Sequence, residues 1–133
     1  MKDNIKIFED KYGLELIISY RKSAIIFEVN NIPEIQDEDN FQFIFDSRTF
    51  KELFEYLYEI ANKSWTDIQL KECNSMGSDY AEYYDRKLDN NGYLGLRENK
   101  LIMERVSEDN NKLYQFNKPK IQSFLYDFKK LIK

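Results

Sequence analysis

Apolar and polar positions alternate in short stretches over the first third of the chain. Four stretches are rich in β-branched and aromatic residues, a pattern typical of β-strands separated by polar turns. They span residues 5–9, 14–21, 23–30 and 41–46. The next segment, residues 47–63, places apolar residues three and four positions apart, which predicts a helix with one buried face. Asp46 is placed to cap this helix, and Thr49 with Glu52 forms an alternative capping box.

The second half of the chain repeats this order of elements. Its strand-like stretches occupy residues 66–73, 80–87, 93–98, 100–106 and 113–116. Residues 118–133 then have the pattern of a second helix with one apolar face. Asn117 is a natural cap for this helix, and Pro119 is tolerated in its first turn.

The two predicted helices match each other position by position. When Phe45 is aligned with Phe116, every position on the predicted buried face of the first helix meets an apolar position of the second. The aligned pairs are Phe50 with Ile121, Leu53 with Phe124, Phe54 with Leu125, Leu57 with Phe128 and Ile60 with Leu131. We therefore predict an α+β fold with a tandem pseudo-repeat, residues 1–63 and 64–133, in one domain spanning residues 1–133. Each unit is a strand meander followed by a helix, and the antiparallel sheets pack with the two helices.

Composition predicts a folded cytoplasmic protein. Hydrophobic residues make up 42% of the 133 residues, and 4 Gly and 2 Pro leave little room for low-complexity sequence. No apolar run reaches the roughly 18 to 20 residues of a membrane-spanning helix, and the N-terminal residues lack the apolar core of a signal peptide. Cys73 is the single cysteine, so no internal disulfide can form. We expect a cytoplasmic protein that contacts no membrane.

The residue types argue against an enzyme. The chain has no histidine, which removes the commonest general base, the usual activator of a Ser or Cys nucleophile and a common zinc ligand. Asp37, Glu38 and Asp39 are adjacent carboxylates of the kind that bind magnesium or carry out glycoside chemistry, but adjacent acids in a polar loop are typically a solvated turn. We expect no catalytic residue, no metal site and no cofactor.

A second group of acids is interleaved with tyrosines in the sequence DYAEYYDRK. Strand alternation places Tyr80, Glu82 and Tyr84 on one face. Two interpretations are open: an edge strand whose rings cap the core with their hydroxyls in water, or an aromatic and acidic surface that binds a basic partner. On the second interpretation, the candidate binding residues are Asp37, Glu38, Asp39, Asp79, Tyr80, Glu82, Tyr83, Tyr84 and Asp85.

The charge distribution argues against nucleic acid as the partner. The net charge is −4, and residues 1–63 carry 8 Lys or Arg against 13 Asp or Glu, so the body of the protein repels phosphate. The cations that remain for a nucleic-acid surface are Arg21 and Lys22, together with lysines of the C-terminal segment. Aromatic residues of the strands would supply the stacking platforms of such a surface.

The order of elements, about four strands and a helix repeated over nearly the whole chain, resembles the Whirly fold of single-strand nucleic-acid binders. Whirly proteins carry a Lys-Gly-Lys-Ala-Ala-Leu motif on an early strand, and the nearest sequence here is RKSAII. Arg21, Ala24 and Ile26 match the motif in kind, whereas Lys22 replaces its glycine and Ser23 its second lysine. The resemblance implies a Whirly-like fold and, as one candidate function, single-stranded nucleic-acid binding through Arg21 and Lys22.

A Whirly-like fold without that motif, in a small acidic protein, also resembles immunity proteins of bacterial contact-dependent growth inhibition systems of the kind found in Neisseria. This resemblance implies an antitoxin that binds the C-terminal domain of one cognate toxin, a nuclease, and neutralises it without a cofactor. We expect the protein to be a monomer.

The outward sides of the two predicted helices differ, and we expect function to lie where the repeats diverge. The first helix carries Glu52, Glu55 and Glu59 there, and the second carries Ser123, Tyr126 and Lys130.

Overall fold

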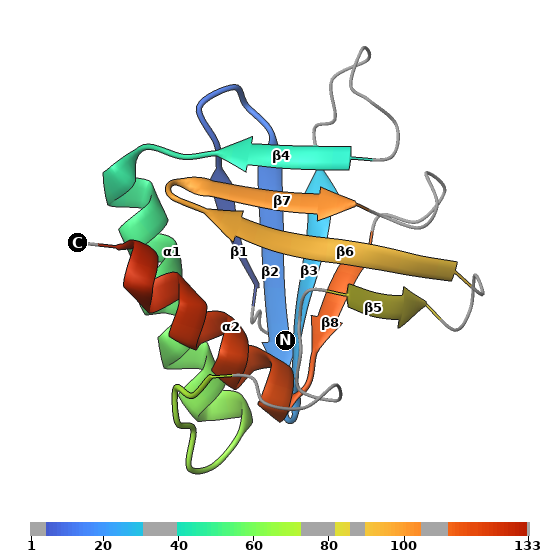
Figure 1. Cartoon of the computed structure of the whole chain (residues 1–133), viewed down its shortest axis with the longest axis vertical. Coiled ribbons are helices and arrows are strands. Elements are labelled where there is room, and N and C mark those ends of the chain that lie inside the picture. Colours follow the sequence, from blue (N-terminus) through green and yellow to red (C-terminus); the bar gives the residue numbers. More distant parts are fainter. Residues whose placement is uncertain (1–4, 31–39, 73–81, 86–89, 105–111, 133) are drawn as a thin grey trace.

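The computed structural model describes residues 5–30, 40–72, 82–85, 90–104 and 112–132 (Figure 1). The strands are β1 (Ile5–Glu9), β2 (Glu15–Arg21), β3 (Ala24–Asn30), β4 (Asn40–Ile44), β5 (Glu82–Asp85), β6 (Asn90–Arg97), β7 (Lys100–Glu104) and β8 (Lys112–Phe116). The helices are α1 (Ser47–Ser64) and α2 (Lys118–Leu131). Each helix follows four strands, so the predicted α+β class, with two units of strand meander and helix, is confirmed.

The strands form two antiparallel sheets, and each sheet takes strands from both halves of the chain. The first sheet has the order β1-β2-β3-β8 and the second has the order β4-β7-β6-β5. The last strand of each half therefore leaves its own meander. β4 pairs with β7, where Phe43 lies opposite Leu101, and β8 pairs with β3, where Phe116 lies opposite Ile25. In Figure 1 the strands of the second sheet run across those of the first, as in orthogonal sheet packing.

Matching two-residue hairpins join β2 to β3 and β6 to β7. Their second residues, Ser23 at φ 67° and Asn99 at φ 62°, are in the left-handed region, where most L residues are disfavoured and asparagine is better tolerated. The backbone N–H of Ser23 donates to the carbonyl of Ser64 at 2.9 Å, and the carbonyl of Asn99 accepts from the N–H of Phe45 at 2.9 Å. The two hairpins are therefore held at opposite ends of α1.

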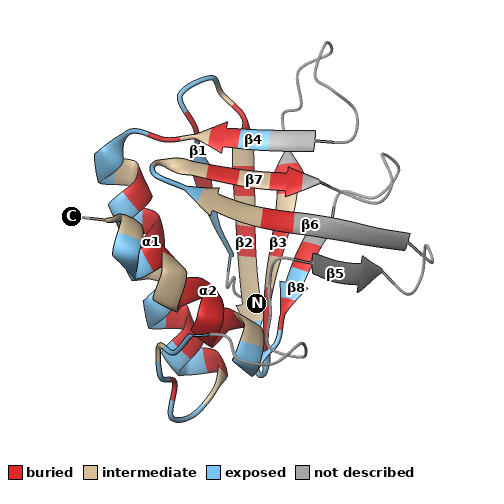
Figure 2. Cartoon of the chain, viewed as in Figure 1, coloured by how far each residue is buried: buried red, intermediate tan, exposed pale blue. Residues whose placement is uncertain are grey.

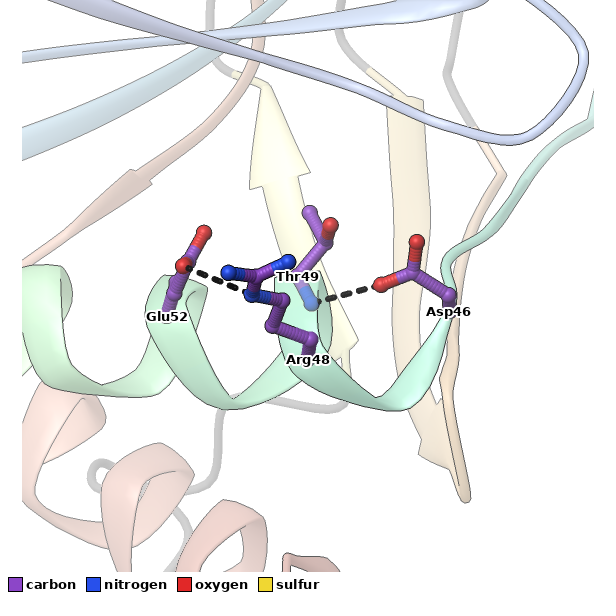
Figure 3. Close-up of polar contacts among 4 residues, drawn as sticks. All are labelled: Asp46, Arg48, Thr49 and Glu52. Atoms are coloured by element: carbon purple, nitrogen blue, oxygen red, sulfur yellow. Dashed lines mark hydrogen bonds and ion pairs between the residues drawn. The ribbon is translucent and has the colours of Figure 1, made fainter.

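Both helices begin with the predicted caps. The Asp46 carboxylate accepts the backbone N–H of Thr49 at 2.7 Å (Figure 3), and the side-chain oxygen of Asn117 accepts that of Lys120 at 3.0 Å. Each bond satisfies an N–H that has no acceptor within its own helix. The two caps occupy aligned positions of the repeat. The hydrogen bonds from Thr49 hold the pKa of the Asp46 carboxyl below its ordinary value of 3.8.

One cluster of buried apolar residues joins both sheets and both helices (Figure 2). Every aligned apolar helix position is buried except Leu131, which is half-buried. The rings of Phe27 and Phe124 both contact Phe116 with centroids 5.0 Å away, which joins the first sheet to α2. Phe50 of α1 lies 4.5 Å from Phe128 of α2. In the described ranges, neither helix is long and apolar enough to cross a membrane.

Two expectations about the second half are wrong. Residues 66–72, the described part of the strand predicted at 66–73, form no strand. Ile68 of this segment is instead buried, and the backbone N–H of Gln69 donates to the side chain of Gln122 at 3.0 Å. Ser123 is also buried rather than outward-facing, and its hydroxyl donates to the carbonyl of Lys120.

Removing the cap of α2 should weaken the fold without changing its core. Asn117→Ala deletes the oxygen that accepts the Lys120 N–H, and we expect the free energy of unfolding to fall by about 1 kcal/mol. Urea denaturation followed by circular dichroism measures the loss. Asn117→Asp keeps an acceptor and should remain close to wild type, so an equal loss in both variants would contradict the role of the cap.

The charged Asp46 cap of α1 should make the free energy of unfolding depend on pH at acidic pH. Because the pKa of Asp46 is lowered in the folded protein, its stabilising contribution is fully present above the ordinary value of 3.8 and is lost as pH falls through the lower folded value. Asp46→Asn has an uncharged cap that does not titrate. The advantage of wild type over Asp46→Asn in urea denaturation should therefore shrink between about pH 6 and about pH 2. A difference that stays constant over this range would count against the charged cap.

Candidate functional site

Three glutamates of α1 line a groove beside β1. Glu52, Glu55 and Glu59 lie three and four positions apart, so their side chains project from the same side of the helix. The groove has a volume of about 360 Å³, and Lys6 and Phe8 line it from β1. The helix side on which the two repeats differ therefore meets the edge of the first sheet. We call this the acidic groove.

Aromatic rings and one cation complete the lining of the acidic groove. The centroids of Phe8 and Tyr56 lie 5.8 Å apart, and the Lys6 ammonium is 5.4 Å from each of them. A cation this close to two ring faces is attracted by both. Burial raises the pKa of the Tyr56 hydroxyl, and the neighbouring Tyr20 and Glu59 raise it further. The Tyr56 hydroxyl is therefore a neutral hydrogen-bond donor at physiological pH.

The glutamates of the acidic groove remain available to a partner. The Glu52 carboxylate lies 3.9 Å from Arg48 (Figure 3), and the Glu59 carboxylate lies 3.4 Å from Lys63. All four side chains are more than half exposed, and pairs of this kind along a helix surface contribute little to stability. Glu55 makes no ion pair with any residue that the structure describes. The groove thus offers three accessible carboxylates against the single cation of Lys6.

The strand beside the acidic groove exposes apolar side chains. β1 pairs with β2 alone among the described strands and forms one edge of the first sheet. Ile5 is 60% exposed and Ile7 is 51% exposed on this strand, and Tyr12 in the following turn is 75% exposed. Large apolar side chains on an edge strand are features that a partner can cover.

A second groove, of about 520 Å³, lies at the C-terminal end of α1. Arg21 and Lys22 of the β2–β3 hairpin line it together with Tyr20, Lys63 and Trp65. Its described lining residues include three cations and two aromatic rings but no carboxylate. The sequence prediction named Arg21 and Lys22 and missed the other three, although a tryptophan directly after an amphipathic helix was a visible signal. We call this the basic groove.

The structure places only part of the predicted acidic and tyrosine surface. Asp37, Glu38, Asp39, Asp79 and Tyr80 lie outside the described residues. Glu82, Tyr83, Tyr84 and Asp85 form β5, which pairs with β6 and ends the second sheet. These four residues thus form an edge strand among the described strands, and the structure describes their backbone alone, so both interpretations of their rings stay open. Their role in binding stays a prediction.

Comparison of the chain with protein-family models, with curated proteins and with solved structures found no match. The resemblances to Whirly proteins and to immunity proteins therefore stay predictions. In the part of the chain that the structure describes, no group of three or more Cys, Asp or Glu side chains is arranged to hold a metal ion.

Proposed function

We propose that the protein is a cytoplasmic immunity protein that binds the C-terminal toxin domain of a contact-dependent growth inhibition system and blocks it by direct contact. The observation that supports this proposal best is the acidic groove together with the exposed Ile5 and Ile7 on the other face of the strand that borders it. Aromatic and aliphatic side chains surrounded by charge are the usual composition of a protein-binding surface. Neutralisation by contact requires no catalytic residue and no cofactor.

The charge of the acidic groove matches the proposed class of toxin. A nuclease binds phosphate through basic residues, so its active surface attracts carboxylates. Glu52, Glu55 and Glu59 would steer such a domain during encounter and then occupy the surface that its substrate needs. The net charge of −4 acts in the same direction over longer distances.

Reversing the charge of Glu55 should slow association with the toxin. We expect Glu55→Lys to lower the association rate with the purified cognate toxin domain roughly tenfold at low salt, and less at high salt, because charges at an interface act mainly on encounter. Surface plasmon resonance measures the rates. Glu72→Lys is the matched control, since it makes the same charge change at an exposed residue that does not line the acidic groove.

Two results would contradict the proposal. The absence of a complex between the wild-type protein and that toxin domain at micromolar concentration would remove the proposed function. Equal slowing by Glu55→Lys and Glu72→Lys would show that net charge alone matters and that the acidic groove is not the contact.

The basic groove favours a second candidate function, the binding of single-stranded nucleic acid. Arg21, Lys22 and Lys63 provide cations for a phosphate backbone, and Tyr20 and Trp65 provide rings on which bases stack. The hydroxyl of the buried Ser64, which also lines this groove, has no hydrogen-bond partner among the described residues. This arrangement is what the Whirly-like resemblance implies for Arg21 and Lys22.

Fluorescence of Trp65, the only tryptophan, tests the second candidate. If a base stacks on its ring, a single-stranded oligonucleotide should quench the emission at low salt, and added salt should reverse the quenching. The double variant Arg21→Glu and Lys22→Glu should abolish the effect, while Lys100→Glu with Lys129→Glu changes the net charge equally outside the groove. No quenching by the wild-type protein at low salt would end this candidate.

A further inference from the structure

Among the described strands, β1 pairs on one side only, and the backbone groups on its other side, the free edge, can be identified. The N–H of Asp10 donates to the carbonyl of Leu14 at 2.9 Å, directly after the paired residues of β1 and β2. Successive residues of a strand direct their backbone groups to opposite sides. The backbone groups of Phe8 and Lys6 therefore point to β2, as those of Asp10 do, and the groups of Ile5, Ile7 and Glu9 point to the free edge.

The two faces of the first sheet differ in chemistry at this edge. On the outer face, Ile7 lies opposite Ile17 of β2 and Ile5 lies beside them, whereas Ile26 of β3 is separated from Ile5 by Ser19 and lies away from the edge. Ile17 and Ile26 are half-buried, whereas Ile5 and Ile7 at the edge are mostly exposed. On the other face, Lys6 and Phe8 border the acidic groove. On the outer face, a strand laid beside β1 would thus meet Ile5 and Ile7, with Glu9 at the end of the row. On the other face it would meet Lys6, Phe8 and the glutamates of the acidic groove.

We propose that β1 recognises an extended segment of a partner protein in which apolar and basic residues alternate, and that this segment pairs with β1 as a fifth strand of the first sheet. Its main chain would bond to the free groups of Ile5, Ile7 and Glu9. Because side chains of a strand alternate between faces, its apolar residues would cover Ile5 and Ile7 and its basic residues would reach the acidic groove. The inference rests on the proposed function only for the identity of the partner, a toxin domain.

Charge decides between such a partner and a second copy of this chain. A second copy paired through β1 would bring its own acidic groove beside the first, and each groove holds three glutamates against one lysine. Like charges placed together oppose association. A segment with several lysines or arginines on one face complements the groove instead, so we assign the edge to a basic partner.

Ile7→Pro tests the backbone part of the proposal. The Ile7 N–H points to the free edge, so proline removes a donor from the edge without removing a bond to β2, and proline is tolerated at such positions. If this variant does not fold, as judged by circular dichroism, the double variant Ile5→Lys and Ile7→Lys replaces it, because it keeps every backbone group and blocks the edge with charge. Ile26→Lys is the matched control on the same face, two strands away from the edge.

The probe is an end-capped peptide of about nine residues in which valine and lysine alternate, roughly the length of a strand. Nuclear magnetic resonance of the labelled protein follows the backbone amides during titration to millimolar peptide. We expect the amides of Ile5, Ile7 and Glu9 to shift and to become protected from exchange. Binding should weaken roughly tenfold or more in the edge variant and remain unchanged in Ile26→Lys. A peptide with the same composition but with its valines and lysines in two blocks should bind much more weakly.

Several outcomes would overturn the inference: no shift of the β1 amides at millimolar peptide, equal binding of the blocked peptide, unchanged binding by the edge variant, or a dimer of the protein that the edge variant dissociates.

Measuring binding of the toxin domain distinguishes a failure of this inference from a failure of the proposed function. If the edge variant binds the toxin as well as wild type does, strand addition is wrong and the proposed function stands. If the wild-type protein binds the peptide at β1 but not the toxin, the proposed function is wrong and the edge inference stands.

Discussion

The exchange of β4 and β8 between the two halves is the constraint on which the rest of the structure depends. Each half forms three strands of one sheet and contributes its fourth strand to the other, through the pairs β4–β7 and β8–β3. Neither half can complete a four-stranded sheet alone. Each exchanged strand also leads directly into a capped helix, so the exchange fixes where α1 and α2 begin. The contact between Phe50 and Phe128 then closes the core between the helices.

This framework repeats inside the molecule but not on its surface. Buried positions of the two helices match because both pack against the same kind of core. On α2, Ser123 is buried and Gln122 accepts the backbone N–H of Gln69, whereas the glutamates of α1 stay exposed beside β1. The two helices therefore have different surroundings although their sequences predict the same packing. An accessible acidic surface remains on α1 only.

Local patterns predicted both helices, their caps and all eight described strands, because period, capping and turn residues act within a few positions. They also predicted a strand at residues 66–73, and residues 66–72 form none. The alternation of Ile68 and Leu70 is equally compatible with a strand, but residues 66–72 form none in the fold. Ile68 is buried there, and the backbone N–H of Gln69 donates to the side chain of Gln122. The exchange of β4 and β8 could not be predicted from local sequence patterns, because strand pairing joins residues that are far apart in the sequence. For the same reason Arg21 and Lys22 were identified but Trp65, brought beside them by the fold, was not.

The two grooves carry unequal weight as evidence for function. Cations near the end of α1, such as Lys63, are what the negative C-terminal end of a helix dipole favours, so the basic groove has a structural explanation of its own. Glu55 stands in the middle of α1, away from the positive end of the dipole, and has no ion pair with a described residue. Its charge does nothing evident for the helix, and Glu55 lines the acidic groove beside β1, which is an edge strand among the described strands of the first sheet. Because the Glu55 carboxylate has no evident structural role and lies beside an edge strand with exposed apolar residues, the acidic groove favours a basic protein partner over nucleic acid.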